Sequence, residues 1–385
     1  MKLLIFTTRF APENVGTARY VELLAGGLAR RGGLDLKVLA PAYGRAHPED
    51  AGLGYPVERI PGGHCSFIPW RYWRTRVALS RVVAQWRPDV VWAANGMATR
   101  VAGTLLDELT MPLIGTVYGT DVARRLPGRT PWTWLESVPQ RRFYTGARRL
   151  LAITRFTQEV LVGKGVDPEK VQVVYMGVET PRGMEETLRQ APHRHPEWLD
   201  RPLLLTVGRL VKQKGHHLLL QAMRQVVDRV PRVLHLIVGD GPERPALARQ
   251  IEELGLAENV LLLGKVSEEM LRDCYALAWA FVLTSHEVRS YVEGMGLVFL
   301  EAASWGVPSV GTRHGGIPEA ILDGQTGFLV DSAQPTQLAT RLEYLLESRE
   351  RCRQLGLAAQ IHVAANFNVE RMAAQSEAQL REVVG

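Results

Sequence analysis

Short apolar runs alternate with helical patterns along almost the whole chain, and this alternation restricts the fold more than any other feature. Runs such as residues 90–93 and 113–117 are continuously apolar, which is typical of parallel strands buried on both faces. Helical patterns such as residues 17–31 and 74–85 lie between them. This repetition predicts an α/β protein with doubly wound, Rossmann-like sheets. The other expected strands are residues 2–7, 36–39, 150–153, 171–174, 203–207, 234–238, 260–263, 281–284 and 308–311.

The alternation breaks once, between residues 181 and 201, where several prolines gather. Clustered proline and glycine favour a linker. The break therefore predicts two Rossmann-like domains, residues 1–185 and 200–365, and the helical pattern continues to residue 384. Two such domains would enclose a cleft, which is the usual place for a ligand in α/β proteins.

The composition is that of a globular protein with an ample core. Of the 385 residues 46% are hydrophobic, yet no stretch of about 18 apolar residues predicts a transmembrane helix. The first residues carry one charge and a very short apolar run, which favours a first strand over a signal peptide. Three scattered cysteines, Cys65, Cys274 and Cys352, fit a reducing cytosol and form no zinc or thiol redox motif.

The net charge of +6 is unevenly distributed. Residues 1–199 hold 27 Lys and Arg against 18 Asp and Glu, a net charge of +9, whereas the remainder has a net charge of −3. The basic half therefore faces something negative or is simply well solvated.

The densest group of candidate binding residues lies between residues 292 and 302. A Gly-x-Gly loop, whose backbone can approach a ligand closely, precedes an apolar run that predicts a buried helix. Glu293 lies before this helix and Glu301 inside it, roughly 7 Å further along the axis at ~1.5 Å per residue. The group offers an anion site between two carboxylates that accept hydrogen bonds from hydroxyl groups, which suits a sugar nucleotide. The N–H groups that would point at the anion lie near Gly296, Leu297 and Val298.

A second group follows the strand expected at residues 203–207. Gly208 and Arg209 come directly after it, and Lys214 lies before the next helix. A forked guanidinium and a mobile ammonium can neutralise a departing diphosphate. No cluster of metal ligands accompanies them, so these two cations would take the place of magnesium.

The run from Glu293 to Glu301 resembles the E-x7-E signature of retaining glycosyltransferases of family 4, and the resemblance continues through residues 304–308, 315–319 and 324–330. Taken alone, the spacing fits two ordinary helix carboxylates equally well. The family has the GT-B fold, in which a last helix, here residues 366–385, crosses back to the first domain. The first domain takes the acceptor and the second takes the donor.

The resemblance also implies roles for single residues. Glu293 would contact the donor sugar and Glu301 the ribose, while Arg209 and Lys214 would hold the diphosphate. It implies sugar transfer with retention at the anomeric carbon, with the nucleotide sugar as a substrate and no cofactor or metal.

The resemblance implies ligand contacts at three further positions, and each of these has a purely structural alternative. Lys265 and Val266 follow a strand where the family contacts the nucleotide base through its backbone, and a plain structural turn is the alternative. Gly16 opens a helix where the backbone would approach a phosphate or sugar. The alternative there is that Asn14 or Thr17 caps the helix.

Two positions depart from the family. Tyr118 stands where a histidine commonly contacts the donor sugar, and Met176 stands where an asparagine is usual. A tyrosine hydroxyl donates or accepts a hydrogen bond but is a poor base at neutral pH. These departures bear on sugar identity and catalytic rate, and not on the phosphate and ribose anchors. Tyr118 remains a candidate catalytic residue.

Aromatic and basic residues alternate between residues 67 and 76. Such a segment suits the headgroup region of an anionic membrane; the alternative is a solvated basic face above tryptophans of the core. No nucleic-acid-binding motif is present, so no nucleic acid partner is expected. Further basic and aromatic positions of this half are Arg81, Trp86, Arg124, Arg125, Arg129, Arg141, Arg142, Arg148 and Arg149.

The leading hypothesis is a cytoplasmic glycosyltransferase, at the inner face of the membrane if the basic half docks there, that moves a sugar to a lipid or glycan hydroxyl. GDP-mannose is favoured over UDP sugars, because the run from residue 292 to 301 resembles mannosyltransferases that act on phosphatidylinositol lipids. Two alternatives stay open: an epimerase or hydrolase of the same fold, and a catalytically silent regulator that binds a sugar nucleotide. A nicotinamide dehydrogenase is disfavoured, because no G-x-G-x-x-G follows the first strand.

Overall fold

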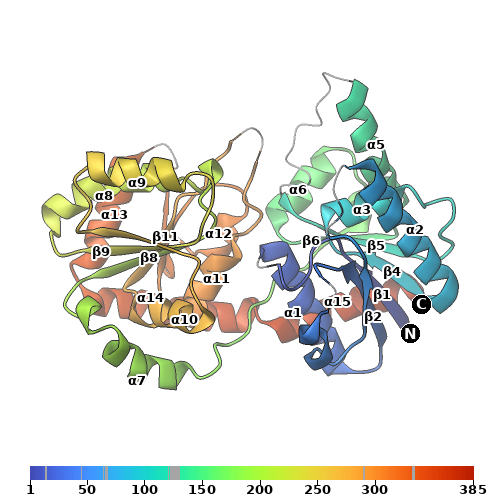
Figure 1. Ribbon diagram of the computed structural model, residues 1–385, viewed down its shortest axis with the longest axis horizontal. Coiled ribbons are helices and arrows are strands. Elements are labelled where there is room, and N and C mark those ends of the chain that lie inside the picture. Colours follow the sequence, from blue (N-terminus) through green and yellow to red (C-terminus); the bar gives the residue numbers. More distant parts are fainter. Residues whose placement is uncertain are drawn as a thin grey trace. The chain divides into compact units, whose positions relative to one another are not determined.

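The computed structural model describes residues 1–13, 15–44, 46–63, 65, 68–119, 121, 131–288, 291–331 and 334–385, and for residues 131–137 it describes only the backbone. The chain divides into two compact units (Figure 1). Unit 1 comprises Met1–Gly177 and Asn368–Gly385, and unit 2 comprises Val178–Phe367. Several residues singled out in the sequence lie outside the described part, namely Asn14, Phe67, Arg124, Arg125 and Arg129.

The segment expected to be a linker is largely helical. Helix α7 (Met184–Arg194) forms within it and belongs to unit 2. Arg194 donates to Asp273 of helix α10 (Glu268–Leu277) at 2.7 Å, and His195 lies 3.1 Å from the same carboxylate. Pro192 lies in the last turn of α7 and has no backbone N–H to donate to the Leu188 carbonyl.

Unit 1 is built on a parallel sheet of seven strands in the order β3-β2-β1-β4-β5-β6-β7. Continuous apolar runs form the central strands because helices bury both faces of the sheet. Helices α1 and α15 cover one face, and α2, α3 and α5 cover the other (Figure 1). The strands are β1 (Lys2–Phe6), β2 (Asp35–Pro41), β3 (Val57–Ile60), β4 (Val90–Ala93), β5 (Leu113–Val117), β6 (Arg149–Ala152) and β7 (Val171–Val173); the helices are α1 (Gly16–Arg31), α2 (Pro69–Trp86), α3 (Gly96–Gly103), α5 (Pro131–Gly146), α6 (Arg155–Gly163) and α15 (Val369–Val384).

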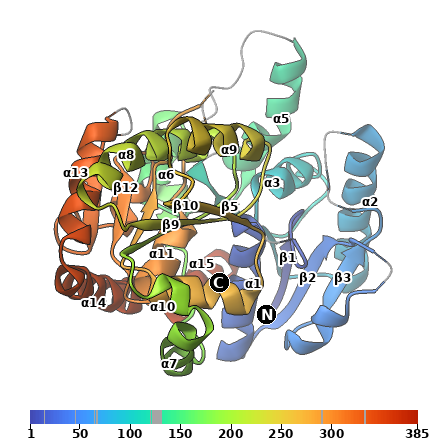
Figure 2. The ribbon, with the colours of Figure 1, turned by 60° about the vertical axis from the view of Figure 1, so that its left-hand side comes forward.

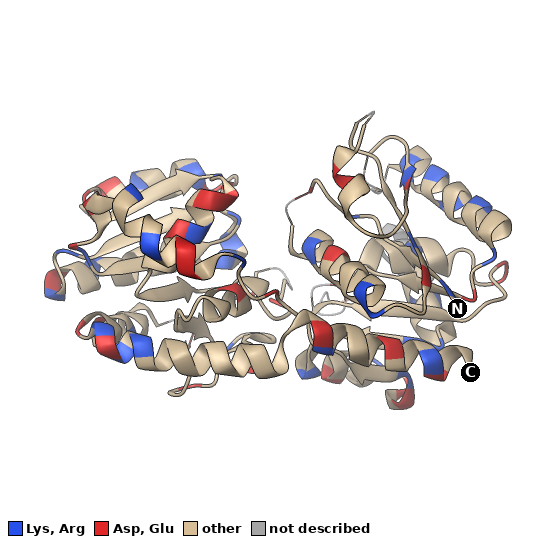
Figure 3. Cartoon of the chain, turned by 90° about the horizontal axis from the view of Figure 1, so that it is seen from below, with Lys and Arg blue, Asp and Glu red and all other residues tan. Residues whose placement is uncertain are grey.

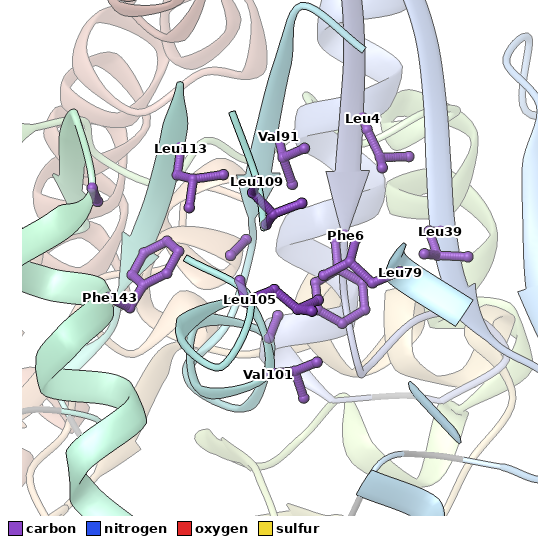
Figure 4. Packing of buried hydrophobic residues seen from close by; sticks show 14 of the residues in the cluster. Leu4, Phe6, Leu39, Leu79, Val91, Val101, Leu105, Leu109, Leu113 and Phe143 are labelled. Carbon is purple, nitrogen blue, oxygen red and sulfur yellow. The ribbon is translucent and has the colours of Figure 1, made fainter. Parts of the chain in front are cut away.

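The core of unit 1 lies between the sheet and the helices α2, α3 and α5. Figure 4 shows Phe6 of β1 and Val91 of β4 facing Leu79 of α2 and Val101 of α3. All four side chains are completely buried, and each contributes roughly 1.5–3 kcal/mol through burial of apolar surface.

The last helix, α15, packs against α1. Gly27 of α1 leaves the room that Val369 and Ala373 occupy, since a Cβ atom there would lie 2.9 Å from Val369 Cγ1 and 3.0 Å from Ala373 Cβ. Arg31 of α1 donates to Glu377 of α15 at 2.7 Å. The C-terminal segment therefore belongs to unit 1.

Unit 2 repeats the architecture with a parallel sheet of six strands in the order β10-β9-β8-β11-β12-β13. Helices α8, α9 and α13 lie on one face and α10, α11 and α14 on the other (Figure 2). Strand order changes direction between β8 and β11, so this is where a ligand is expected, outside the carboxyl ends of the strands. The strands are β8 (Leu203–Val207), β9 (Leu234–Val238), β10 (Val260–Gly264), β11 (Ala280–Leu283), β12 (Ser309–Thr312) and β13 (Gly327–Val330); the remaining helices are α8 (His216–Arg229), α9 (Arg244–Glu253), α11 (Leu297–Ser304), α12 (Ile317–Ala320), α13 (Pro335–Leu346) and α14 (Arg349–Asn366).

Candidate functional site

The segments that leave β8 and β11 are held together at the switch point of unit 2. Thr284 Oγ1 donates to the carbonyl oxygen of Gly215 at 2.8 Å, and the His286 N–H donates to the Gln213 carbonyl at 3.0 Å. Gly215 has φ +69°, and a Cβ atom there would lie 2.1 Å from the Thr284 carbonyl oxygen. Because only glycine fits this close approach, the loop that carries Arg209 and Lys214 has a fixed position beside β11.

Lys214, Ser285 and Glu293 meet at this edge of the sheet. The Lys214 ammonium forms an ion pair with Glu293 Oε2, and Ser285 Oγ donates to the same oxygen at 3.1 Å. Burial is the largest single influence and lowers the pKa of Lys214, but Glu293 and Tyr291 together outweigh it and the pKa is raised. Lys214 is therefore charged at neutral pH.

Arg209 adds a second cation beside this group. Its side chain is exposed and has no ion-pair partner among the residues that the structure describes. The guanidinium is close enough to Lys214 to oppose the rise of its pKa. Two positive charges at the end of β8, with Gly208 directly before them, form a place where an anion would be attracted.

The backbone of Glu293 is fixed by the loop that follows β12. The Gly316 N–H donates to the Glu293 carbonyl at 3.1 Å, and the Glu293 N–H lies 3.4 Å from His314 Nε2. Gly315 has φ +59°, and a Cβ atom there would come within 2.1 Å of the Glu293 carbonyl oxygen. Glycine at position 315 is thus required by close backbone packing.

Helix α11 begins where the sequence predicted it. Gly296 precedes it with φ +76°, no side chain caps it, and its first turn holds no acidic residue. The N–H groups of Leu297 and Val298 have no acceptor within the helix. Inside the helix, Glu301 Oε2 accepts a hydrogen bond of 3.2 Å from the Tyr275 hydroxyl. Burial, with Glu301 nearby, raises the pKa of Tyr275 well above its usual value, so Tyr275 stays a proton donor.

Lys265 and Val266 follow β10, two strands away from β8. Lys265 is exposed and Val266 is half-buried. The Gly264 carbonyl before them accepts from the Gly239 N–H at 2.8 Å, which fixes the start of the turn. Their predicted contact with the base remains a prediction.

Gly16 and Tyr118 belong to unit 1. Gly16 is the first residue of α1 and is exposed, and a Cβ atom there would meet nothing within 4 Å. The N-cap residue is Val15, which makes no side-chain capping bond, and Thr17 already lies inside the helix. Capping by Thr17, one alternative to a ligand contact, is therefore wrong.

The Tyr118 side chain is buried. Its hydroxyl donates to the Ala94 carbonyl at 3.1 Å, and its ring lies edge-on to Tyr20 with 5.7 Å between centroids. Burial raises the pKa of Tyr118 well above its usual value, so the residue acts as a neutral hydrogen-bond donor in this arrangement. Met176 is buried as well, and the Gly177 N–H after it contacts Met372 Sδ at 3.2 Å.

Sequence patterns did not single out Ser285, Tyr275 or His314. Tyr275 lies 26 residues from Glu301, and His314 lies 21 residues from Glu293. Ser285 lies eight residues before Glu293 and outside the run from residue 292 to 302. The position of Ser285, two residues beyond the strand β11, was the available signal, because carboxyl ends of neighbouring parallel strands meet at one edge.

The described residues offer neither a metal-binding cluster nor a membrane-spanning helix. They contain no group of three or more His, Cys, Asp or Glu side chains arranged to hold a metal ion. Nor does this part of the chain contain a helix with the length and hydrophobicity needed to cross a membrane.

Comparison with known proteins identifies the family. A model described as Glycosyltransferase Family 4 matches residues 15–182, and one described as Glycosyl transferases group 1 matches residues 189–362. A D-inositol 3-phosphate glycosyltransferase of Geodermatophilus obscurus is 30% identical over 339 residues, covering 83% of this chain and 70% of the relative. The chain belongs to the family 4 glycosyltransferases.

This glycosyltransferase has further similar relatives. A GDP-mannose-dependent alpha-(1-6)-phosphatidylinositol monomannoside mannosyltransferase of Mycolicibacterium smegmatis is 29% identical over 365 residues, 92% of each chain. The structure of Anabaena Alr3699/HepE in complex with UDP and glucose matches with a TM-score of 0.80 at 20% identity, over 99% of this chain and 100% of that one. The predicted family, the GT-B fold and the assignment as a glycosyltransferase are therefore confirmed.

Proposed function

We propose that this glycosyltransferase moves mannose from GDP-mannose to a hydroxyl group of a lipid acceptor, with retention at the anomeric carbon and without a metal ion. The Mycolicibacterium smegmatis relative, which its name describes as GDP-mannose-dependent and acting on a phosphatidylinositol monomannoside, supports the choice of donor and acceptor class. The UDP bound to the Anabaena protein makes a UDP sugar the donor to test beside it.

The observation that carries the proposal is the group at the end of β8 and β11. Arg209 is exposed and without an ion-pair partner in the described part of the chain, and Lys214 is kept charged beside Glu293. The two cations suit the two phosphates of a nucleoside diphosphate. The N–H groups of Leu297 and Val298 add donors of the kind that bind anions at helix starts.

The chemistry follows from these groups. The bond between the anomeric carbon and the diphosphate oxygen breaks, and the bond to the acceptor oxygen forms on the same face of the sugar. The acceptor proton passes to the departing diphosphate oxygen. Negative charge grows on the diphosphate during this step, and Arg209 and Lys214 stabilise it because they are already in place.

Helix α2 supports a lipid acceptor. Trp70 and Trp73 at its start are 53% and 64% exposed, so the alternative that these tryptophans belong to the core is wrong for both. Arg71 and Arg74 pack on the Trp70 ring at 5.2 and 4.6 Å and have no acidic partner among the described residues. The basic positions are blue in Figure 3. Exposed tryptophan beside unpaired arginine favours an anionic lipid surface.

The test is a transfer assay with purified protein. GDP-mannose and UDP-glucose are each incubated with and without phosphatidylinositol vesicles, and the products are separated by mass spectrometry. Mannosylated lipid from GDP-mannose, with no glucosylated lipid from UDP-glucose, is the expected result, and NMR of the new linkage reports retention. Free sugar or an epimer as the main product would instead identify a hydrolase or an epimerase. Binding of GDP-mannose without turnover would identify a regulatory protein.

A further inference from the structure

The buried hydroxyl of Ser285 lies directly behind Glu293. Ser285 is completely buried, so its side chain cannot itself reach a ligand. Its Oγ donates to Glu293 Oε2 at 3.1 Å, the same oxygen that pairs with the Lys214 ammonium. The other oxygen, Oε1, has no hydrogen-bond partner among the described residues, and Glu293 as a whole is 8% exposed.

The two contacts to Oε2 differ in what they can specify. An ammonium is a compact point charge with three rotatable donors, so an ion pair with Lys214 leaves the carboxylate free to turn. A single hydroxyl donor imposes a direction. Ser285 is therefore the group that decides which oxygen of Glu293 stays exposed.

The backbone of Ser285 is held from three sides. Thr312 Oγ1 of β12 donates to the Ser285 carbonyl oxygen. The neighbouring Thr284 and His286 are tied to the loop that carries Lys214, through Gly215 and Gln213. A hydroxyl on so rigid a support can fix the partner side chain.

We propose that Ser285 is a positioning residue that orients Glu293 so that Oε1 accepts a hydrogen bond from a hydroxyl of the donor sugar. This inference rests on the proposed function, because it takes the sugar of a nucleotide sugar as the ligand of Glu293. The nucleoside diphosphate part is held by Arg209 and Lys214, which Ser285 does not touch.

The Ser285→Ala variant tests the inference by comparing turnover of the nucleotide sugar with binding of GDP alone. We expect kcat/KM for the nucleotide sugar to fall about tenfold or more, as for loss of a hydrogen bond to a charged group. The Kd of GDP alone should stay within about twofold of wild type, because both cations remain. If Ser285 had only a structural role, its loss would lower kcat/KM and weaken GDP binding together. Ser309→Ala is the matched control, since it removes another buried hydroxyl of unit 2 that has no hydrogen-bond partner, and it should change neither value.

A double-mutant cycle shows whether Ser285 acts through Glu293. In a Glu293→Gln background, the Ser285→Ala change should cause little further loss of kcat/KM. Wild-type turnover by Ser285→Ala, or an undiminished loss in the Gln background, would overturn the inference.

A crystal structure of the Ser285→Ala variant separates this inference from the proposed function. We expect the Glu293 carboxylate to take more than one orientation in the variant and a single one in wild type. A single, unchanged orientation in the variant would overturn the inference whatever the enzyme transfers. Absence of sugar transfer by wild type from every nucleotide sugar would refute the proposed function alone.

Discussion

Lys214 and the histidines near it show how burial sets the charge of single residues in unit 2. Lys214 stays charged in a largely buried position because Glu293 lies against it. His216, by contrast, faces the Arg209 carbonyl at 3.1 Å, and burial lowers its pKa to about 4. Burial lowers the pKa of His235, whose Nε2 lies 2.9 Å from Thr206 Oγ1, to about 3. Lys214, which is charged, and His216, which is neutral, are thus only two residues apart.

These histidines predict a loss of stability in acid. An unfolded histidine titrates near ~6.5, so below that pH the unfolded chain binds protons that His216 and His235 in the folded protein do not bind. The free energy of unfolding therefore falls as pH falls from about 6.5 towards 4, by roughly 1.4 kcal/mol per pH unit for each histidine.

Urea unfolding at pH 7 and at pH 5 measures this effect. His235→Gln should reduce the difference between the two pH values by about 2 kcal/mol, the share of one histidine over about 1.5 pH units. His193→Gln, a change at an exposed position, is the control and should leave the difference unchanged. An equal difference in wild type and His235→Gln would contradict the assignment.

At the scale of elements, two adjacent glycines of α1 have opposite surroundings. A Cβ atom at Gly26 would meet only Arg30 Nη1, at 3.6 Å, whereas one at Gly27 would lie 2.9 Å from Val369 Cγ1 of α15. Gly26→Ala should raise the free energy of unfolding by about 0.5–1 kcal/mol, because glycine is unfavourable inside helices.

Gly27→Ala receives the same gain in helix propensity but forces α15 away from α1. Overpacking typically costs about 1–3 kcal/mol, so this variant should be less stable than Gly26→Ala by that amount. Thermal unfolding of the two variants side by side provides the measurement. Equal stabilisation by both changes would mean that α15 does not pack tightly on α1.

The sequence predicted the central strands well and missed one edge strand in each sheet. The strands at 90–93 and 113–117 have the predicted limits, because burial on both faces demands a continuous apolar run. The strands β3 and β13 were missed. Each lies at an edge of its sheet. Strand β3 carries Glu58 and Arg59 and so lacks the apolar pattern of a central strand, whereas β13 is apolar and buried throughout but only four residues long.

The C-terminal helical region, predicted to continue to residue 384 with a last helix at residues 366–385, consists of α13, α14 and α15. The breaks coincide with side-chain caps: Ser348 accepts from the Arg351 N–H at 3.2 Å, and Asn368 accepts from the Arg371 N–H at 2.7 Å. Serine and asparagine at these positions are the usual start signals of helices. Local motifs likewise indicated Arg209, Lys214, Glu293 and Glu301, whereas Ser285 and Tyr275 required the fold.

At the scale of the whole molecule, the charges differ between the halves of the chain. Residues 1–199 carry a net charge of +9 and the rest −3, and the exposed tryptophans at the start of α2 lie in the basic half. The Trp70→Ala/Trp73→Ala double variant should bind vesicles containing phosphatidylglycerol at least about tenfold more weakly than wild type, because interfacial binding scales with buried apolar area.

Vesicle sedimentation measures this binding, and added salt should weaken it through screening. Leu357→Ala is the control, since Leu357 is 57% exposed but lies on α14 in unit 2. Equal binding of wild type to neutral and anionic vesicles, or an equal loss in Leu357→Ala, would contradict a role for α2 at a lipid surface.

The central claim is that Arg209 and Lys214 hold the diphosphate of a nucleotide, and calorimetric titration of GDP tests it most directly. Arg209→Ala and Lys214→Ala should each weaken GDP binding about tenfold or more, because each removes a charged hydrogen-bond donor to phosphate. Lys212→Ala, which removes an exposed cation from the same turn, should bind GDP as wild type does. Unchanged GDP affinity in Arg209→Ala and Lys214→Ala would contradict the account.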